Sequence, residues 1–197
     1  MEEYRRIVNF IKNSKSVITS KDFKENKISY YYINKMIENN YIKRIATGIY
    51  GKTDSFDDEF YILQQRYKKA VFSYNTALYL IGETEVTPDK FDITIPREYN
   101  VKSFKYEIKV HYIKKEYLDL GITKIQSPYG NMVTCYNLER TICDIVKNDN
   151  SLDKEQTNKI IRNCFQNNKI NGSIIMDYAK KLKCKGKIKS IMEVMIW

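Results

Sequence analysis

Apolar residues recur at helical spacing in two short segments at the start of the chain. Residues 4–12 place apolar side chains on one face and basic or amide side chains between them, which predicts an amphipathic helix. A second, shorter helix is expected over residues 20–26. Thr19 or Ser20 can cap it, and Phe23 is its main core-facing residue.

A third helix is predicted over residues 30–39, with Ser29 as its N-cap. Apolar positions spaced i, i+3, i+6 and i+7 predict its buried stripe, which consists of Tyr30, Ile33, Met36 and Ile37. The helix should end at Asn39-Asn40, because asparagine tolerates the left-handed conformation that often follows a helix.

Two short β segments follow, over residues 41–45 and 49–52, around the turn Ala46-Thr47-Gly48. Three helices and a hairpin within 52 residues match the plan of a winged helix-turn-helix domain. In that plan the third helix enters the DNA major groove and the hairpin forms a wing beside a phosphate backbone. The alternative is a small three-helix domain used for protein contacts.

The remainder of the chain, 53–197, is expected to form an α+β domain with a helical C-terminal tail. An acidic start at Asp57-Asp58-Glu59 predicts a helix to about Arg66, and Ser73 caps a second helix that Gly82 ends. Strands are expected over 91–96, 105–113 and 131–136, and later helices over 137–147, 153–166, 173–183 and 187–196.

Net charge adds a clue about partners. The chain carries 34 Lys and Arg against 24 acidic residues, a formal charge of +10. Residues 1–52 hold eleven basic and five acidic side chains, 53–150 hold thirteen and fifteen, and 151–197 hold ten and four. Both ends are therefore basic around a neutral middle. Attraction to phosphates explains such a surplus, and a lysine-rich surface that maintains solubility explains it equally well.

Cysteine and histidine usage argues against a metal or thiol site. The four cysteines lie far apart in sequence, without a C-x-x-C pair, and are expected to be reduced core thiols: Cys135, Cys143, Cys164 and Cys184. The single histidine, His111, falls in a predicted strand with nothing to pair it. No signal peptide or membrane span is apparent, so a soluble, cytoplasmic protein without a cofactor is expected.

The candidate DNA-contacting residues follow from the winged-helix plan. On the third helix, residues that point away from the predicted stripe can read base edges or contact phosphates. Residues of the hairpin and of the start of the second helix suit backbone contacts. The full set is Lys21, Ser29, Tyr31, Tyr32, Asn34, Lys35, Arg44 and Thr47.

Two enzymatic interpretations are weaker. Pro88-Asp89 followed by Glu107-Ile108-Lys109 matches the permissive P-D…(D/E)-x-K pattern of metal-dependent nucleases, in which the acids hold Mg²⁺ and the lysine steadies water. Gly172-Ser173 with Asp177 is faintly similar to a nucleotidyltransferase, but the paired acids are missing, and Gly172-Ser173 is better explained as a helix cap. We predict no catalytic residues.

The ordered set of segments resembles the AbiEi family, the antitoxin half of type IV toxin–antitoxin systems linked to abortive phage infection. The resemblance covers about residues 17–147, and its most specific parts are Phe72–Gly82 and the strand ending Pro96-Arg97. The segments that carry it are Ile28-Ser29, Arg44–Tyr50, Phe72–Gly82, Thr87-Pro88, Asp92–Arg97 and Asn137–Asp144. Asn40 departs from the family, which more often has glycine there.

The resemblance implies a protein with two roles. One is repression of its own operon, through binding of double-stranded DNA at promoter repeats by the winged domain. The other is neutralisation of a nucleotidyltransferase-like toxin by the C-terminal domain, apparently without a lasting complex. The family supplies no catalytic residue. The alternatives are a Mg²⁺-dependent nuclease and a winged-helix regulator unrelated to a toxin.

Overall fold

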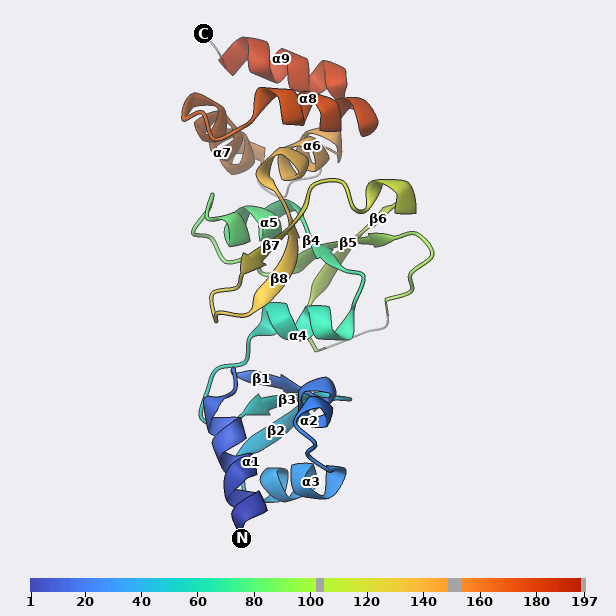
Figure 1. Ribbon diagram of the computed structural model, residues 1–197. Helices are drawn as coiled ribbons and strands as arrows, with labels where there is room; N and C mark the ends of the chain where they lie inside the picture. The colour runs from blue at the N-terminus through green and yellow to red at the C-terminus, as the bar shows by residue number, and fades with distance from the viewer. Residues whose placement is uncertain (102–104, 149–153, 196–197) are drawn as a thin grey trace. The chain divides into compact units, whose positions relative to one another are not determined.

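The computed structural model describes residues 1–101, 105–148 and 154–195, and it has the α+β class expected from the sequence, with two separate sheets. The chain divides into two compact units (Figure 1). The first unit contains Met1–Lys68 and Gln126–Val133, and the second contains Lys69–Ile125 and the chain from Thr134 onward. Among the described residues, no helix has the length and apolar character needed to cross a membrane.

The first unit begins with three helices and a three-stranded antiparallel sheet of order β1-β3-β2. The predicted helices and hairpin are present, and strand β1 was not expected from the sequence. The elements are α1 (Glu2–Asn13), β1 (Val17–Thr19), α2 (Ser20–Glu25), α3 (Tyr30–Glu38), β2 (Ile42–Ala46), β3 (Ile49–Lys52) and α4 (Glu59–Arg66).

Helix α2 begins where the sequence predicted, because Thr19 and Asp22 form a reciprocal cap. The Thr19 hydroxyl accepts a hydrogen bond from the Asp22 amide at 3.3 Å, and the Asp22 carboxylate accepts one from the Thr19 amide at 2.7 Å. Phe23 is then 1% exposed and packs edge-on against Tyr50, with ring centroids 5.3 Å apart. The cap thus directs the main aromatic residue of α2 into the core.

Helix α3 differs from its predicted stripe at one position. Ile33 and Met36 are buried, but Tyr30 is 59% exposed, so its assignment to the core was wrong. Tyr30 occupies the first helical position, where its ring lies beside Arg44 of strand β2 instead of facing the core. Ser29 occupies the N-cap position without a side-chain capping bond. Asn40 has the left-handed backbone expected after the helix, with φ 58°.

A buried carboxylate extends the first unit past residue 52, where the sequence placed a domain boundary. Asp58 is fully buried and accepts hydrogen bonds from the Tyr61 amide, the Ser127 hydroxyl and the Asn131 amide at 3.0, 2.6 and 2.7 Å. Three donors compensate the cost of burying this charge. The bonds join the start of helix α4 to a segment about seventy residues further along the chain.

The second unit is built on a five-stranded mixed sheet of order β6-β5-β4-β8-β7. Strand β5 pairs parallel to β6 and antiparallel to β4, and β4 pairs parallel to β8. Its elements are β4 (Val71–Phe72), α5 (Tyr74–Ile81), β5 (Phe91–Pro96), β6 (Ile108–Ile113), the 3₁₀ helix η1 (Lys115–Tyr117), β7 (Ile122–Gln126), β8 (Met132–Tyr136), α6 (Leu138–Asn148), α7 (Lys154–Gln166), α8 (Gly172–Lys181) and α9 (Lys185–Met195).

Strand β5 is more deeply buried than its alternating sequence indicates. All six of its residues are buried, including Asp92 and Thr94 on the face expected to be polar. The Asp92 amide donates to the Thr76 hydroxyl at 2.8 Å, and the Thr94 hydroxyl donates to the Ser73 hydroxyl at 2.9 Å. The polar face therefore supports α5 and the turn before it, and is not exposed to solvent.

The predicted helical tail is present, and α6 packs against α8 and α9 (Figure 1). Its core includes three of the four cysteines, and all four are buried and free, as expected: Cys135, Cys143, Cys164 and Cys184. Burial raises the pKa of the Cys135 thiol to about 12. A thiol with that pKa is unreactive at neutral pH.

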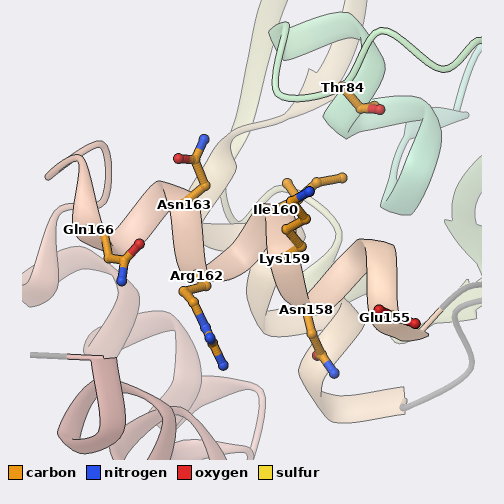
Figure 2. A pocket seen from close by; sticks show the side chains of 8 residues that line it. All are labelled: Thr84, Glu155, Asn158, Lys159, Ile160, Arg162, Asn163 and Gln166. Carbon is orange, nitrogen blue, oxygen red and sulfur yellow. The ribbon is translucent and has the colours of Figure 1, made fainter. Parts of the chain in front are cut away.

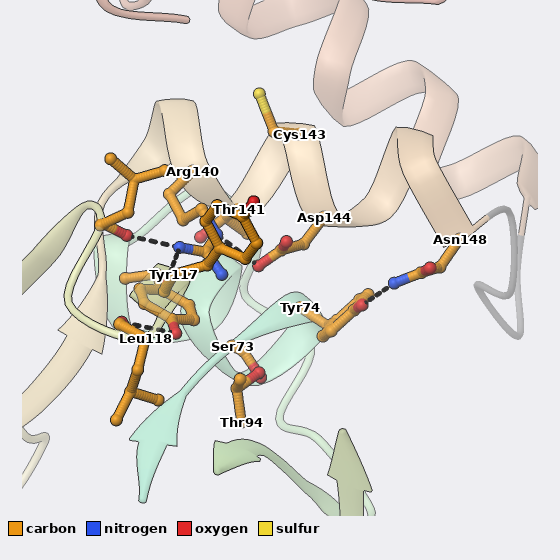
Figure 3. Close-up of polar contacts among 12 residues, drawn as sticks. Ser73, Tyr74, Thr94, Tyr117, Leu118, Arg140, Thr141, Cys143, Asp144 and Asn148 are labelled. Carbon is orange, nitrogen blue, oxygen red and sulfur yellow. Dashed lines mark hydrogen bonds and ion pairs between the residues drawn. The ribbon is translucent and has the colours of Figure 1, made fainter. Parts of the chain in front are cut away.

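A buried ion pair holds the start of α6 (Figure 3). Arg140 is fully buried, and its Nε donates to Asp144 at 2.9 Å. Its Nη1 donates to the carbonyl oxygens of Tyr117 and Leu120 at 2.8 and 2.6 Å, and its guanidinium lies 4.1 Å from the centroid of the Tyr136 ring. Burial raises the pKa of Asp144 although Arg140 acts to lower it.

We predict that Arg140→Met destabilises the protein by roughly 3–5 kcal/mol in urea denaturation, because Asp144 then stays buried without a countercharge. The deficit should shrink as the pH is lowered. The folded-state pKa of Asp144 is raised above that of an unfolded aspartate, so its protonation on acidification removes the buried charge and favours the folded state. Arg140→Met/Asp144→Leu should be more stable than the single variant, and a single variant as stable as the wild type would contradict this account.

Candidate nucleic-acid interface

The face formed by α3 and strand β2 presents basic and aromatic side chains together. Of the eight residues expected to contact DNA, Lys21, Ser29, Tyr31, Arg44 and Thr47 are exposed. The remaining three are half-buried: Tyr32, Asn34 and Lys35. The structure does not gather all eight around one point: six of them lie in three small groups, and Ser29 and Asn34 belong to none of these.

The first group is built around the Arg44 guanidinium. Its Nη2 donates a hydrogen bond to the Tyr30 hydroxyl at 2.7 Å, and its Cζ lies 5.8 and 5.6 Å from the ring centroids of Tyr30 and Tyr50. Arg44 and Tyr50 are register partners in the β2–β3 hairpin, which places the two side chains on one face. The hydrogen bond to Tyr30 raises the pKa of Arg44. A guanidinium held by two rings is oriented before any ligand arrives.

Tyr30 is the residue of this group that sequence reasoning missed. It was assigned to the core because a large aromatic residue at the right spacing usually packs inward. The only signal for its actual role is that tyrosine, unlike the isoleucines of the stripe, carries a hydroxyl that needs a partner. Nothing in the local sequence identifies Arg44 as that partner.

The second group lies on the outer face of α3. The Lys35 ammonium lies 5.7 Å from the ring centroids of both Tyr4 and Tyr31, and Tyr31 is 66% exposed. Tyr32 instead packs against the core of the first unit and meets Tyr31 edge-on at 5.3 Å. Tyr32 therefore supports the exposed ring of Tyr31, although it was expected to point away from the core.

The third group lines a hollow of about 450 Å³ that brings Lys21 and Thr47 together. The Ser20 amide donates to the Gly48 carbonyl at 2.9 Å, which ties the start of α2 to the hairpin turn. Gly48 has φ 73°, and an added Cβ would lie 3.1 Å from the Ser20 hydroxyl oxygen, so both conformation and space favour glycine there. Lys68 of the same hollow has its pKa lowered by burial and by Lys21.

The nuclease pattern does not assemble into a site in the part of the chain that the structure describes. Glu107 is 70% exposed and pairs with Lys90 at 2.9 Å. Asp89 and Lys109 line a cavity of about 270 Å³ whose lining does not include Glu107. The β5–β6 register places Lys109 opposite Asp92. Among all the residues that the structure describes, no cluster of three or more acidic, histidine or cysteine side chains is suited to hold a metal ion.

Two further expectations need correction. His111 is not unpaired, because its Nε2 lies 2.7 Å from the Asp92 carboxylate and its ring stacks on Tyr74 at 3.8 Å. The cap of α8 is Asn171, whose side-chain oxygen accepts bonds from the amides of Ser173 and Ile174, both at 3.1 Å. The Gly172-Ser173 pair therefore lies inside the first turn.

A broad hollow of about 940 Å³ lies along α7 in the second unit. Figure 2 shows Thr84 on the opposite wall, with Asn158 and Arg162 pointing away from it. The other lining side chains are mostly amide or charged, and include Glu155, Lys159 and Asn163. No arrangement of an acid, a base and a nucleophile is apparent among them, so this hollow does not define a catalytic site.

No known protein-family model and no curated protein sequence matches this chain. In fold, the chain is similar to the crystal structure of the RV2827C protein from Mycobacterium tuberculosis, with a TM-score of 0.62. The match covers 96% of this chain and 80% of that chain, at 10% sequence identity. At this identity the similarity shows a shared fold and nothing about function.

If the α3–β2 face contacts duplex DNA, Tyr30→Phe should weaken binding roughly fivefold, because the ring remains while the bond that orients Arg44 is lost. Fluorescence anisotropy with a labelled duplex measures the change. Tyr31→Phe removes a hydroxyl from the neighbouring exposed ring and is the matched control. Equal effects of the two variants would show that the Tyr30–Arg44 bond does not orient the guanidinium for binding.

Proposed function

We propose that this protein is a type IV antitoxin that represses its own operon by binding promoter DNA, and that neutralises a nucleotidyltransferase-like toxin in the cytoplasm. The observation that carries the DNA-binding half is the oriented Arg44 guanidinium on the hairpin beside helix α3. The antitoxin half rests on the resemblance to the AbiEi family.

The element order of the first unit supports a winged-helix interpretation. Three helices precede a two-stranded hairpin, and the short strand β1 pairs with the second hairpin strand, β3. In winged-helix proteins the third helix enters the major groove and the hairpin follows the backbone. Under this proposal, Asn34 and Lys35 on α3 reach base edges or phosphates. Arg44 on β2 and Thr47 at the turn contact the backbone.

The third group of the first unit also suits backbone contacts. Ser20 and Thr47 supply hydroxyls to the hollow, and Lys21 and Lys68 supply cations. Asp22 and Glu25 line the hollow as well. The Asp22 carboxylate already accepts the amide and hydroxyl of Thr19, and Glu25 pairs with Lys21 at 3.7 Å. Neutral and cationic donors of this kind position a protein on DNA without reading its sequence.

Three of the four segments that resemble the AbiEi family in the second unit supply much of its interior, and the fourth, Thr87-Pro88, lies nearer the surface. Phe72–Gly82 contains the end of β4 and helix α5, Asp92–Arg97 contains most of β5, and Asn137–Asp144 begins α6. Helix α5 packs against both β5 and α6. Buried residues such as Ser73 and Thr94 bond to each other and maintain the fold. Residues that act on a toxin would therefore lie outside these segments, on the surface.

The test is an electrophoretic mobility shift with the protein's own upstream DNA, comparing the wild type with Lys35→Ala and Arg44→Ala. We expect each substitution to weaken binding roughly tenfold, since each removes a cation from the proposed interface. Lys115→Ala, in the second unit, removes one exposed cation and is the control. Failure of the wild type to bind would refute the repressor half of the proposal.

Binding should also depend steeply on salt. If the interface neutralises about six phosphates, affinity should fall by roughly three orders of magnitude between 50 and 200 mM salt. The slope of log affinity against log salt concentration, measured by anisotropy, checks this. A nearly flat response would contradict an electrostatic interface.

Two rival functions are separated by simple experiments. A Mg²⁺-dependent nuclease centred on Asp89, Glu107 and Lys109 would cut plasmid DNA on incubation with Mg²⁺, and Glu107→Gln would abolish cutting. A repressor leaves the plasmid intact. A regulator unrelated to a toxin would lack a neighbouring nucleotidyltransferase-like gene. Where such a neighbouring gene is present, expressing it with and without this protein tests the antitoxin role directly.

A further inference from the structure

The cavity of about 270 Å³ in the second unit contains a buried carboxylate that is only partly satisfied. Asp92 lines this cavity and is 5% exposed. Its Oδ1 lies 2.7 Å from Nε2 of His111, and its Oδ2 has no hydrogen-bond donor among the residues that the structure describes. Thr157 of α7 lines the same cavity and is also 5% exposed, and its hydroxyl has no hydrogen-bond partner among those residues. Buried polar groups are usually paired, so these two groups indicate a place for a polar ligand.

The side chain of Asp92 is held in one orientation by the residues behind it. The His111 ring that contacts Asp92 stacks on the ring of Tyr74, with centroids 3.8 Å apart. The Tyr74 hydroxyl accepts a hydrogen bond from the side-chain amide of Asn148 (Figure 3). Tyr74 has φ 48°, which is unfavourable for a bulky residue. Such strain persists only where surrounding contacts enforce it, and it is frequent at ligand-binding sites.

The other walls of the cavity combine aliphatic and charged side chains. Leu78 of α5 and Ile160 of α7 supply aliphatic surface. Lys109 of β6 is the register partner of Asp92 on β5, so a cation and a carboxylate from neighbouring strands line one cavity. None of the described residues that line it is aromatic, which disfavours a nucleobase as the ligand, since bases bind by stacking on aromatic rings. The volume lies below the range of about 300–1,000 Å³ that is typical for drug-sized ligands.

We propose that this cavity binds a small aliphatic α-amino acid. The ammonium group of the ligand donates to Oδ2 of Asp92 and to the hydroxyl of Thr157, which gives the buried carboxylate a charged donor. The ligand carboxylate lies toward Lys109, and the aliphatic side chain contacts Leu78 and Ile160. A net-neutral ligand with charges of both signs matches an acid and a cation in one cavity. The site lies within the second unit and uses no residue of the α3–β2 face, so it is independent of the proposed function.

The chain supplies its own reporter for this site. His111 is the single histidine, so its ring gives one set of NMR signals, directly beside the carboxylate. The full-length wild type is titrated with alanine, valine and leucine, and with isocaproate and isoamylamine, which are leucine without its ammonium or its carboxylate group. We expect at least one amino acid to shift the His111 signals saturably, with a Kd below about 1 mM. Both analogues should bind roughly tenfold more weakly than leucine, because each loses one ionic contact.

Two variants of equal charge change separate the buried carboxylate from the general charge of the cavity. Asp92→Asn keeps the shape of the side chain and removes its charge. Asp89→Asn removes the same charge from an exposed residue that lines the same cavity and is the matched control. We expect Asp92→Asn to bind the amino acid roughly tenfold more weakly in isothermal titration calorimetry, and the control to stay within about twofold. Circular dichroism checks the fold of both variants.

The wild-type titration decides the inference even where Asp92→Asn does not fold. Absence of a saturable His111 shift with all three amino acids would indicate that water satisfies Asp92, and would overturn the inference. Isoamylamine binding as tightly as leucine would indicate an amine site and overturn the assignment to amino acids. Equal losses in Asp92→Asn and Asp89→Asn would reduce the effect to net charge, with the same consequence. Each of these results leaves the DNA-binding tests of Lys35→Ala and Arg44→Ala unaffected.

Discussion

The buried guanidinium of Arg140 ties together parts of the second unit that the sequence keeps apart. It donates hydrogen bonds to Asp144, one turn along α6, and to two carbonyl oxygens that follow strand β6. It also makes a cation–π contact with the ring of Tyr136 at the end of β8. A buried cation tolerates few arrangements, because each unsatisfied donor is costly. Asp58 has the same effect in the first unit, where it binds Ser127 and Asn131. The extent of each unit thus depends on a buried charge as well as on apolar packing.

Helices with a clear apolar periodicity are predictable from the sequence. Short strands, and contacts between residues far apart in the sequence, are not. Helices α1, α3 and α6 repeat apolar positions over several turns, so their existence and approximate bounds are predictable. Strands β1 and β4 have three and two residues, too few to show alternation, and β7 was not predicted. The pairing of His111 with Asp92 requires the parallel register of β5 and β6, which no local pattern specifies.

At the candidate interface, too, the sequence predicts which side chains avoid the core but does not predict how they are oriented. That Lys35 and Arg44 avoid the core follows from the helical stripe and from the position of the hairpin. The orientation of Arg44 does not follow, because it depends on Tyr30, fourteen residues earlier, and on Tyr50 across the hairpin. Tyr30 was assigned inward because its ring is apolar, yet it lies outward because its hydroxyl meets a guanidinium. For amphipathic side chains such as tyrosine, spacing alone does not decide whether the apolar ring or the polar group determines the orientation of the side chain.

The buried acids and the exposed cations of the described part of the chain have different surroundings. Its buried acids have structural partners: Asp58 binds two side chains and an amide, Asp92 contacts His111, and Asp144 pairs with Arg140. The cations of α3 and β2 are instead exposed or half-buried. Exposed cations are suited to a polyanion, whose phosphates release counterions on contact, and they need no enclosed pocket to bind it.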